Sequence, residues 1–262
     1  MKLSISNIGW SIEQDEAVYS LMKEYGFTGL EIAPTRIFPE KPYELLPEAA
    51  AWSSVLMAKY GFSVSSMQSI WFGRQEQLFG TDDERKTLLN YTKKAVDFAA
   101  SVGCKNMVFG CPRNRAVPKG TDSDLAIGFF REIGNYAAQN GTIIGMEANP
   151  EIYHTNYIND TSSALELVKR VNSKGFRLNL DVGAMVHNHE DIAGLEDNVR
   201  LISHVHISEP ELKEIEPRRL HLDLKKLLLD ESYRGYVSIE MGKTDDLSVI
   251  EEKMKYVRSV FQ

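Results

Sequence analysis

Hydrophobic and polar positions along the chain repeat as one unit: a stretch with helical spacing, a glycine, and a short apolar stretch. Six junctions of this kind carry Gly26, Gly61, Gly103, Gly141, Gly175 and Gly235. A glycine after a helix adopts the left-handed conformation that closes the last turn at little steric cost. The pattern therefore predicts helices that end near these glycines, each followed by a strand.

Eight strands are predicted from the apolar stretches. Two of them, at residues 3–8 and 202–207, lack the glycine lead-in. The other six lie at residues 30–33, 64–68, 107–110, 143–147, 178–181 and 237–240. Between the strands, apolar residues such as Val18, Leu21 and Met22 recur at three- and four-residue spacing. This spacing is typical of an amphipathic helix that faces a core.

Strands that alternate with helices favour a parallel sheet with right-handed crossovers, and eight such units can close into a barrel. The chain has 262 residues, which suits one barrel. An open doubly wound sheet is the alternative, but no glycine-rich phosphate motif follows the first strand. No linker-like tract divides the chain, because the polar loop at residues 113–124 lies inside the repeat. We predict an α/β fold, a single (β/α)8 TIM barrel, as one domain over residues 1–262.

Charge and composition exclude some classes of function. The net charge of −7 at pH 7 argues against a nucleic-acid partner, whose phosphates need a basic face. No apolar run is long enough to cross a bilayer, and the first ten residues do not resemble a signal peptide. Two cysteines, Cys104 and Cys111, cannot form a disulfide framework. We therefore expect a cytoplasmic protein without a membrane partner, and the sequence leaves a homo-oligomer open.

Polar residues end several predicted strands on the face opposite the apolar side chains. Strand side chains alternate between faces, so Leu178 and Leu180 oppose Asn179 and Asp181. The apolar face should pack on the helices, and the polar face should point to the barrel axis. The last inward residues of the last four strands are then Glu147, Asp181, His206 and Glu240. Barrel active sites are built at these carboxyl ends of the strands.

Three carboxylates and one imidazole cannot share a buried mouth unpaired, because repulsion and desolvation would force protonation or misfolding. A divalent cation resolves this conflict. Oxygen-rich ligation with one histidine suits manganese, magnesium, cobalt or zinc. We expect one divalent metal ion, with Mn2+ as first choice and Mg2+, Co2+ or Zn2+ as alternatives. Its open positions would accept substrate oxygens, polarise a carbonyl and stabilise an enediolate.

The motifs around these strand ends resemble the sugar phosphate isomerase/epimerase family, within the xylose-isomerase-like TIM barrel superfamily. The resemblance covers essentially the whole chain. The motifs that carry it are Met146-Glu147-Ala148-Asn149-Pro150, Leu180-Asp181-Val182-Gly183, His204-Val205-His206-Ile207-Ser208-Glu209-Pro210 and Ser238-Ile239-Glu240-Met241. The resemblance implies that the metal ligands are Glu147, Asp181, His206 and Glu240.

The resemblance also implies catalytic roles for Glu147 and Glu240. In ketose epimerases of this kind, one glutamate takes the proton next to the carbonyl and the other returns a proton on the opposite face. One position departs from the family pattern. Relatives often have a substrate-contacting histidine three residues after the ligand aspartate, where this chain has Ala184. His187 and His189 lie further on and are the candidates to replace that contact, although their spacing differs; of the two, His187 is our substrate-binding candidate.

Further substrate-binding candidates lie near the predicted mouth. Glu31 and Gln68 end their strands facing inward, where they bind substrate hydroxyls or only satisfy the polar mouth. Trp10 and Trp71 follow the first and third strands, and an aromatic face can stack on a sugar ring or simply pack a loop.

Three more segments contribute candidates. Arg113, together with Arg115, follows the fourth strand and either meets an anionic group or is a solvated loop charge. Glu209 and His221 belong to the seventh strand–helix segment, and His221 contacts the substrate or caps a helix. Asn149 belongs to the motif that follows the fifth strand and is included among the substrate-binding candidates.

We therefore expect a metal-dependent isomerase or epimerase of a sugar or sugar derivative that abstracts a proton next to a carbonyl. Its partner is a small-molecule carbohydrate. A lyase acting on an oxidised sugar is an alternative, because it begins with the same proton abstraction. An endonuclease-like metal hydrolase is another, opposed by Ala184 and by the acidic charge. A non-catalytic sugar-binding barrel is the remaining class.

Overall fold

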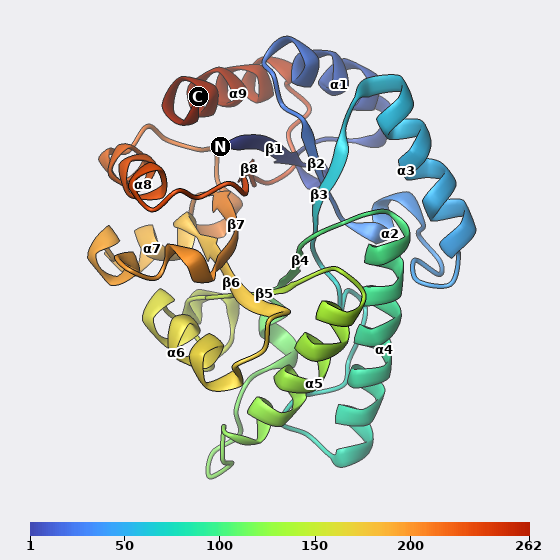
Figure 1. The fold of residues 1–262 in the computed structure, drawn as a ribbon, viewed down its shortest axis with the longest axis vertical. Helices are drawn as coiled ribbons and strands as arrows, with labels where there is room; N and C mark the ends of the chain where they lie inside the picture. The colour runs from blue at the N-terminus through green and yellow to red at the C-terminus, as the bar shows by residue number, and fades with distance from the viewer.

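The eight predicted strands are all present and close into a parallel barrel in chain order (Figure 1). The structure is a computed structural model that describes residues 1–262. Every strand lies within two residues of its predicted bounds. The strands are β1 (Lys2–Ser6), β2 (Gly29–Ile32), β3 (Ser63–Met67), β4 (Met107–Phe109), β5 (Ile144–Glu147), β6 (Phe176–Asp181), β7 (Ile202–Ile207) and β8 (Tyr236–Ile239). The predicted TIM barrel is confirmed.

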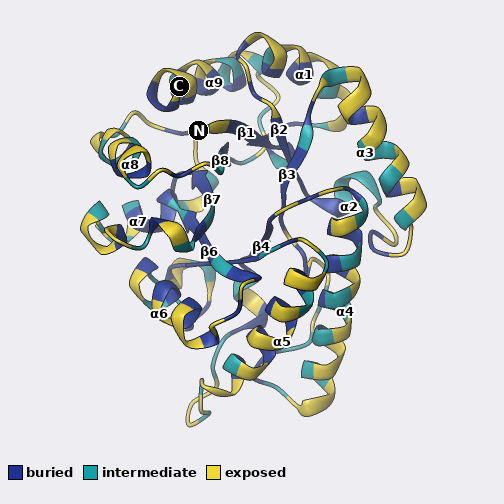
Figure 2. Ribbon diagram, viewed as in Figure 1, coloured by how far each residue is buried: buried dark blue, intermediate teal, exposed yellow.

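Helices surround the barrel and turn one face toward it. Figure 2 shows buried strands in the interior and exposed outer faces on the surrounding helices. The helices are α1 (Asp15–Glu24), α2 (Pro34–Ile37), α3 (Leu46–Tyr60), α4 (Asp82–Ser101), α5 (Leu125–Gln139), α6 (Thr161–Val171), α7 (Val182–His187), α8 (Arg219–Asp230) and α9 (Leu247–Phe261). The predicted apolar stripe is confirmed in α1, where Val18, Tyr19 and Met22 are buried.

The glycine junctions are left-handed at four of the six predicted places. Gly26, Gly61, Gly103 and Gly141 have positive φ angles. Gly175 does not, and there Asn172 takes the left-handed position with φ 48° after α6. Gly175 is needed for a different reason, because a Cβ at this residue would overlap the carbonyl oxygen of Gly134 in α5. At Gly235, likewise, Ser232 has the positive φ angle.

The strand register aligns the polar ends of β6 and β7. A register shift between Leu178 and Asn179 places Asn179 opposite His204 and Asp181 opposite His206. β1 and β8 pair over four positions, which closes the barrel. Bulges of this kind are found at barrel rims and beside active sites, where they redirect side chains.

Polar side chains fill the barrel axis, as the alternation predicts. Across the interior, Gln68 Nε2 donates to Ser6 Oγ over 2.7 Å, and Asn106 Nδ2 donates to Ser66 Oγ over 3.0 Å. The apolar faces of the strands instead join a core of 67 buried residues between the sheet and the helices. The interior is thus a hydrogen-bonded polar column inside an apolar shell.

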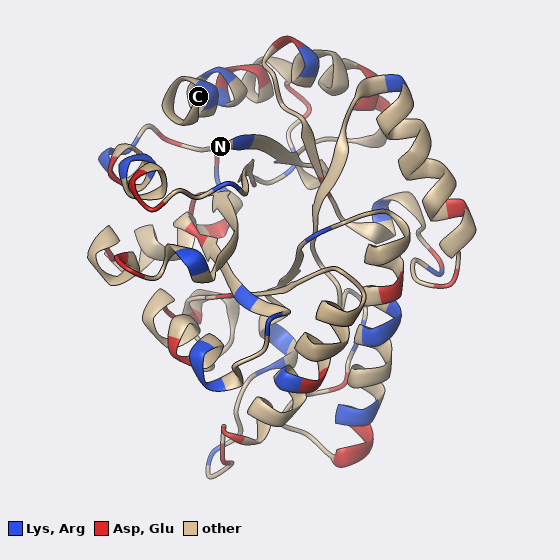
Figure 3. Cartoon of the chain, in the orientation of Figure 1, with Lys and Arg blue, Asp and Glu red and all other residues tan.

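Charged residues of both signs are interspersed over the surrounding helices (Figure 3). None of the helices has the length and hydropathy needed to span a bilayer.

Candidate active site

Four side chains from consecutive strands converge at the carboxyl end of the barrel. Glu147, Asp181, His206 and Glu240 each offer a ligand atom, and these atoms lie within 4.8 Å of one another. His206 Nδ1 is 3.1 Å from Glu147 Oε1, 3.1 Å from Glu240 Oε2 and 3.8 Å from Asp181 Oδ2. The structure therefore brings together the four residues that the sequence selects.

The three carboxylates retain a narrow access to solvent that the imidazole lacks. The side chains of Glu147, Asp181 and Glu240 are 11%, 13% and 10% exposed, whereas that of His206 is fully buried. The carboxylates therefore keep some contact with solvent at the carboxyl end of the barrel, whereas the imidazole has none.

Asp181 is held by the transition from β6 to α7. Its Oδ1 accepts a 2.6 Å hydrogen bond from the backbone N–H of Ala184, which caps the first turn of α7. Its Oδ2 accepts a hydrogen bond from Ser208 Oγ over 3.1 Å. An aspartate that ends a strand and begins a helix has little rotational freedom, so its carboxylate is fixed toward the cluster.

Glu147 is held by two amide donors. Asn179 Nδ2 donates to Oε1 over 2.8 Å, and Asn149 Nδ2 donates to Oε2 over 3.1 Å. Gly110, just after β4, leaves the space that this carboxylate needs, because an added Cβ would lie 2.8 Å from Glu147 Oε2. Both oxygens of Glu147 therefore have fixed positions.

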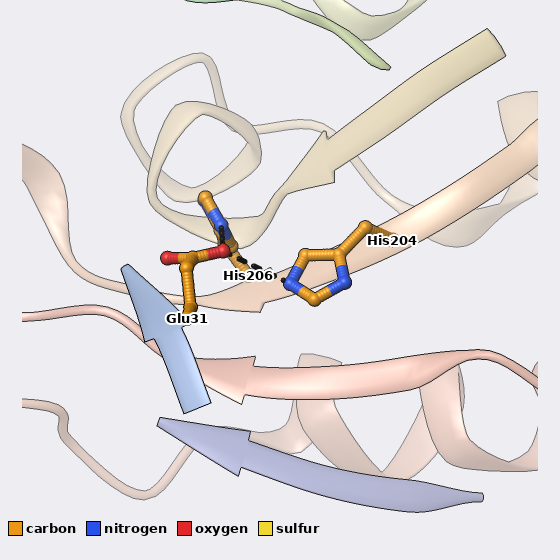
Figure 4. A group of neighbouring side chains, drawn as sticks. All are labelled: Glu31, His204 and His206. Carbon is orange, nitrogen blue, oxygen red and sulfur yellow. Dashed lines mark hydrogen bonds and ion pairs between the residues drawn. The ribbon is translucent and has the colours of Figure 1, made fainter. Parts of the chain in front are cut away.

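His206 is fixed from behind by Glu31, whose carboxylate points at the imidazole (Figure 4). His206 Nε2 lies 2.9 Å from Glu31 Oε2, so Nδ1 faces the three other carboxylates. His204 Nε2 is also 3.1 Å from Glu31 Oε2, close enough for an ion pair but not aligned for a hydrogen bond. When a histidine binds a metal through one ring nitrogen, the other nitrogen commonly faces a carboxylate in this way.

The charges in this cluster shift one another's proton affinities. Burial alone would lower the pKa of His206, but Glu240 and Glu31 outweigh it and hold that pKa well above its ordinary value. Burial would raise the pKa of Glu31, yet His206 and His204 keep it well below its usual range. The pKa of His204 is lowered by burial, although Glu31 opposes the shift.

Glu240 differs from the other carboxylates of the cluster. Burial raises the pKa of its carboxyl to about 7, and the negative charges of Glu147 and Asp181 add to this effect against the opposing influence of His206. A carboxylate pushed toward neutrality in this way gains from a nearby cation, which favours the charged form. The donor set of three oxygens and one imidazole nitrogen thus fits a divalent metal ion.

Two predicted substrate residues lie within the polar column. Gln68 donates to Glu31 Oε1 over 3.0 Å as well as to Ser6. Glu31 itself is fully buried. The structure therefore brings Glu31 to the Nε2 side of His206, whereas the other three carboxylates lie on the Nδ1 side.

The two candidate tryptophans are packed in the core. Trp10 is 1% exposed and its Nε1 donates to Asp15 over 2.7 Å. Trp71 is 2% exposed, donates to Thr92 on α4 over 2.8 Å and packs edge-on against Phe109. Neither ring offers a free face in this structure, so sugar stacking by these residues stays a prediction.

The structure separates the two arginines that follow β4. Arg113 is exposed, whereas Arg115 is completely buried and its Nη2 donates to the carbonyl oxygen of Glu147 over 3.0 Å. His187 is exposed at the end of α7, which follows β6.

Glu209 and His221 are engaged by neighbours. Glu209 is buried and forms two hydrogen bonds with Arg218, from Nε over 2.7 Å and from Nη2 over 2.5 Å. His221 is buried in α8, with Nδ1 2.8 Å from the hydroxyl of Tyr256 on α9. The structure does not place His221 among the four clustered side chains, and its substrate contact stays a prediction.

Three side chains near the cluster are absent from our predicted site. Asn179 shares the inward face with Asp181, and this alternation was the signal that pointed to it. Arg115 follows the same strand as Arg113, and sequence position alone does not reveal which of the two arginines is buried. Tyr153 lies near the charges of Asp181, Glu240 and Glu147, and burial raises its pKa to about 12. It ends a short helical turn after β5, Glu151–Tyr153, which is too short for a periodicity to indicate its orientation.

A hollow lies at the opposite end of the barrel from the cluster, between α3 and α4. Its volume is about 560 Å³, and it is lined by residues such as Met57, Phe62, Ser101 and Val102. No lining residue has a titratable side chain, so the hollow lacks groups for acid–base or metal chemistry.

Several solved structures are similar to this chain along its whole length. The 3-keto-D-glucoside 4-epimerase YcjR from E. coli has a TM-score of 0.78 at 21% identity, over 99% of each chain. The D-psicose 3-epimerase from Clostridium cellulolyticum H10 has a TM-score of 0.76 at 16% identity, over 100% of each chain. An AP endonuclease, family 2, from Brucella melitensis has a TM-score of 0.70 at 18% identity, over 99% of this chain and 96% of that one. At these identities the likeness concerns the fold.

No curated protein matches the chain. A family model does, over residues 19–260, and its description is xylose isomerase-like TIM barrel. The match runs from α1 to α9 and includes all four clustered residues at the barrel mouth. The chain belongs to the xylose isomerase-like TIM barrel family.

Proposed function

We propose that this protein is a metal-dependent isomerase or epimerase of a sugar or sugar derivative. The observation that carries the proposal is the cluster of Glu147, Asp181, His206 and Glu240 at the barrel mouth, with ligand atoms within 4.8 Å of one another. Sugar epimerases among the similar structures add support at the level of the fold.

The four clustered side chains would hold one divalent metal ion. Three carboxylates this close repel one another, and this repulsion adds to the effect of burial, which is the main cause of the raised pKa of Glu240. When bound, the ion would polarise a substrate carbonyl and stabilise the negative charge that develops on its oxygen. Manganese is our first choice, and magnesium, cobalt or zinc would suit the same donors.

The positions of the two glutamates support a role in proton transfer. Glu147 ends β5 and Glu240 follows β8, so they come from the outer two of the four contributing strands. A substrate held between them would have one carboxylate on each side. We propose that one glutamate removes the proton next to the carbonyl and the other returns a proton to the opposite face.

The two glutamates differ in their surroundings, which supports different tasks. Glu147 accepts hydrogen bonds from Asn149 and Asn179, which fix the positions of both of its carboxylate oxygens. Glu240 lacks such amide donors, and burial raises its pKa to about 7.

Metal content provides the first test. Mass spectrometry of the wild type after incubation with manganese should give close to one ion per chain, and Glu147→Gln combined with Asp181→Asn should lose it. A matched control is Glu166→Gln with Asp230→Asn, which makes the same charge change on exposed positions of α6 and α8. A wild type that takes up no metal would sink the proposal and favour a sugar-binding protein.

Proton exchange tests the reaction itself. In deuterated water, the manganese-loaded protein should exchange a carbon-bound proton of a ketose or keto-sugar, as followed by NMR across a broad panel. Product analysis separates an epimer from the unsaturated product of a lyase. Cleavage of abasic-site DNA, without exchange on any sugar, would overturn the proposal in favour of the endonuclease alternative.

A further inference from the structure

A buried arginine lies directly behind Glu147. Arg115 is 0% exposed, and its hydrogen-bond acceptors are Met146 Sδ at 3.6 Å, the carbonyl oxygen of Glu147 at 3.0 Å and Asn149 Oδ1 at 2.8 Å. None of these three acceptors carries a formal charge. Burying a cation without a direct carboxylate partner is unfavourable, which suggests that Arg115 has a role that outweighs this cost.

Asn149 connects this arginine to the Glu147 carboxylate. Its Oδ1 accepts from Arg115, so its Nδ2 faces Glu147 Oε2 and donates to it over 3.1 Å. An amide can rotate by half a turn and exchange its oxygen and nitrogen. Arg115 prevents this exchange, because the rotated amide would turn its nitrogen toward the guanidinium and its oxygen toward the carboxylate.

The loop after β4 is shaped to deliver Arg115 to this position. Cys111 has a positive φ angle of 48°, and a short helical turn, Pro112–Asn114, follows it. Asn114 anchors the turn, because its Nδ2 donates to the carbonyl oxygens of Arg74 and Glu76 over 3.1 and 2.9 Å. These bonds attach the loop to the segment that follows β3, and Arg115, the next residue, contacts the end of β5.

Arg115 stays charged in this place. Burial lowers the pKa of its guanidinium to about 10, and nearby Cys111 and Glu147 oppose the shift. At neutral pH the group therefore remains a cation beside Glu147.

We propose that Arg115 is a positioning residue for Glu147, which locks the Asn149 amide so that it holds the Glu147 carboxylate in the orientation for binding metal and transferring a proton. The inference rests on the proposed function. The proposal predicts that loss of Arg115 changes the metal affinity in the direction opposite to that expected from charge alone. Removal of a positive charge near a cation site should tighten metal binding through space, whereas loss of the orientation should weaken it.

The experiment measures manganese affinity by calorimetry on folded, metal-stripped variants. Arg115→Met should weaken manganese binding by about 10-fold or more, the usual effect of losing a residue that orients a ligand. Arg115→Lys, which keeps a charged donor, should recover part of the affinity. The control is Arg131→Met, because Arg131, like Arg115, donates to a backbone carbonyl oxygen but lies exposed on α5; this variant should bind as the wild type does.

Asn149→Asp provides a second variant, in case Arg115→Met does not fold. The new carboxylate pairs directly with Arg115 and keeps its charge compensated, but it cannot donate to Glu147. Weaker manganese binding despite the added negative charge supports the proposal. Binding equal to or tighter than the wild type in Arg115→Met, or in Asn149→Asp, overturns the role of Arg115 and leaves the proposed function standing. A wild type that binds no manganese overturns both.

Discussion

At the scale of single residues, His206 joins two groups of carboxylates with its two ring nitrogens. Nδ1 faces Glu147 and Glu240, and Nε2 faces Glu31. A carboxylate behind a metal-binding imidazole fixes the orientation of the ring and raises its basicity. Glu31 therefore has a role in this arrangement without contact with a substrate.

Replacement of Glu31 by glutamine should weaken metal binding. We expect Glu31→Gln to lower manganese affinity by about 10- to 100-fold, because His206 loses its ionised partner. Titration calorimetry measures the affinity. Glu209→Gln is the matched control, since Glu209 is also a buried glutamate but pairs with Arg218. Equal losses in both variants would mean that net charge alone determines the affinity.

His221 should make the protein sensitive to acid. Burial lowers its pKa to about 4, from an unfolded value of roughly 6.5. Between these values the unfolded chain binds a proton that the folded chain does not, so the free energy of unfolding falls as the pH falls from 6.5 to 4. The full contribution is roughly 3 kcal/mol, at about 1.4 kcal/mol per pKa unit.

The variant His221→Gln removes this linkage. Urea unfolding at a series of pH values should show a smaller loss of stability between pH 6.5 and 4 in the variant than in the wild type. Parallel curves for the two proteins across this window would show that His221 does not carry the acid sensitivity.

At the scale of elements, the site is built from residues at the ends of the strands. Asp181 ends β6 and caps α7, and Glu147 ends β5 against the space that Gly110 leaves at the end of β4. These positions are set by backbone geometry, so the side chains are already oriented before any ligand binds. Rigid elements hold catalytic groups more precisely than loops do.

A methyl group at the end of β4 should disturb the site on β5. In Gly110→Ala the new Cβ would lie 2.8 Å from Glu147 Oε2 and 3.4 Å from Asn149 Oδ1, so the carboxylate must move. We expect weaker manganese binding and lower stability. Gly128→Ala in α5 is the control, because nothing lies within 4 Å of its new Cβ; this helical change should stabilise by about 0.5–1 kcal/mol. Unchanged manganese affinity in Gly110→Ala would contradict the close packing of the two strands.

At the scale of the whole molecule, closure of the barrel pairs the first strand with the last and brings residues far apart in sequence into contact. β1 pairs with β8, and Glu31 on β2 reaches His206 on β7 across 175 positions of sequence. The site therefore depends on the closed barrel and cannot form in a fragment that lacks one of its sides.

We predict that residues 1–262 unfold as one domain and that manganese shifts the whole transition. At a concentration about 100 times the dissociation constant, a metal bound only by the folded state adds about 2.7 kcal/mol of stability. Differential scanning calorimetry should give one transition that rises with manganese and falls with a chelator. Two transitions, with only the later half of the chain responding to metal, would contradict the single domain.

The order of the strands and the identity of the four clustered residues were predictable from the sequence. Both depend on local rules: glycine after a helix, alternation of faces along a strand, and the meeting of parallel strand ends at one mouth. These rules act over a few residues, so the inward position of Glu147, Asp181, His206 and Glu240 follows from the pattern around each of them.

Only the tertiary structure decided what these residues touch. Trp10 and Trp71 are buried in the core, Glu31 lies behind His206, and Arg115 rather than Arg113 turns inward. Each outcome depends on the path of a loop or on contacts between strands distant in sequence, which local periodicity does not encode. The sequence by itself thus determined the barrel and its acidic mouth, and the packing of loops and neighbouring strands decided which side chains support that mouth, because burial and hydrogen bonding arise only when the ring of strands is closed.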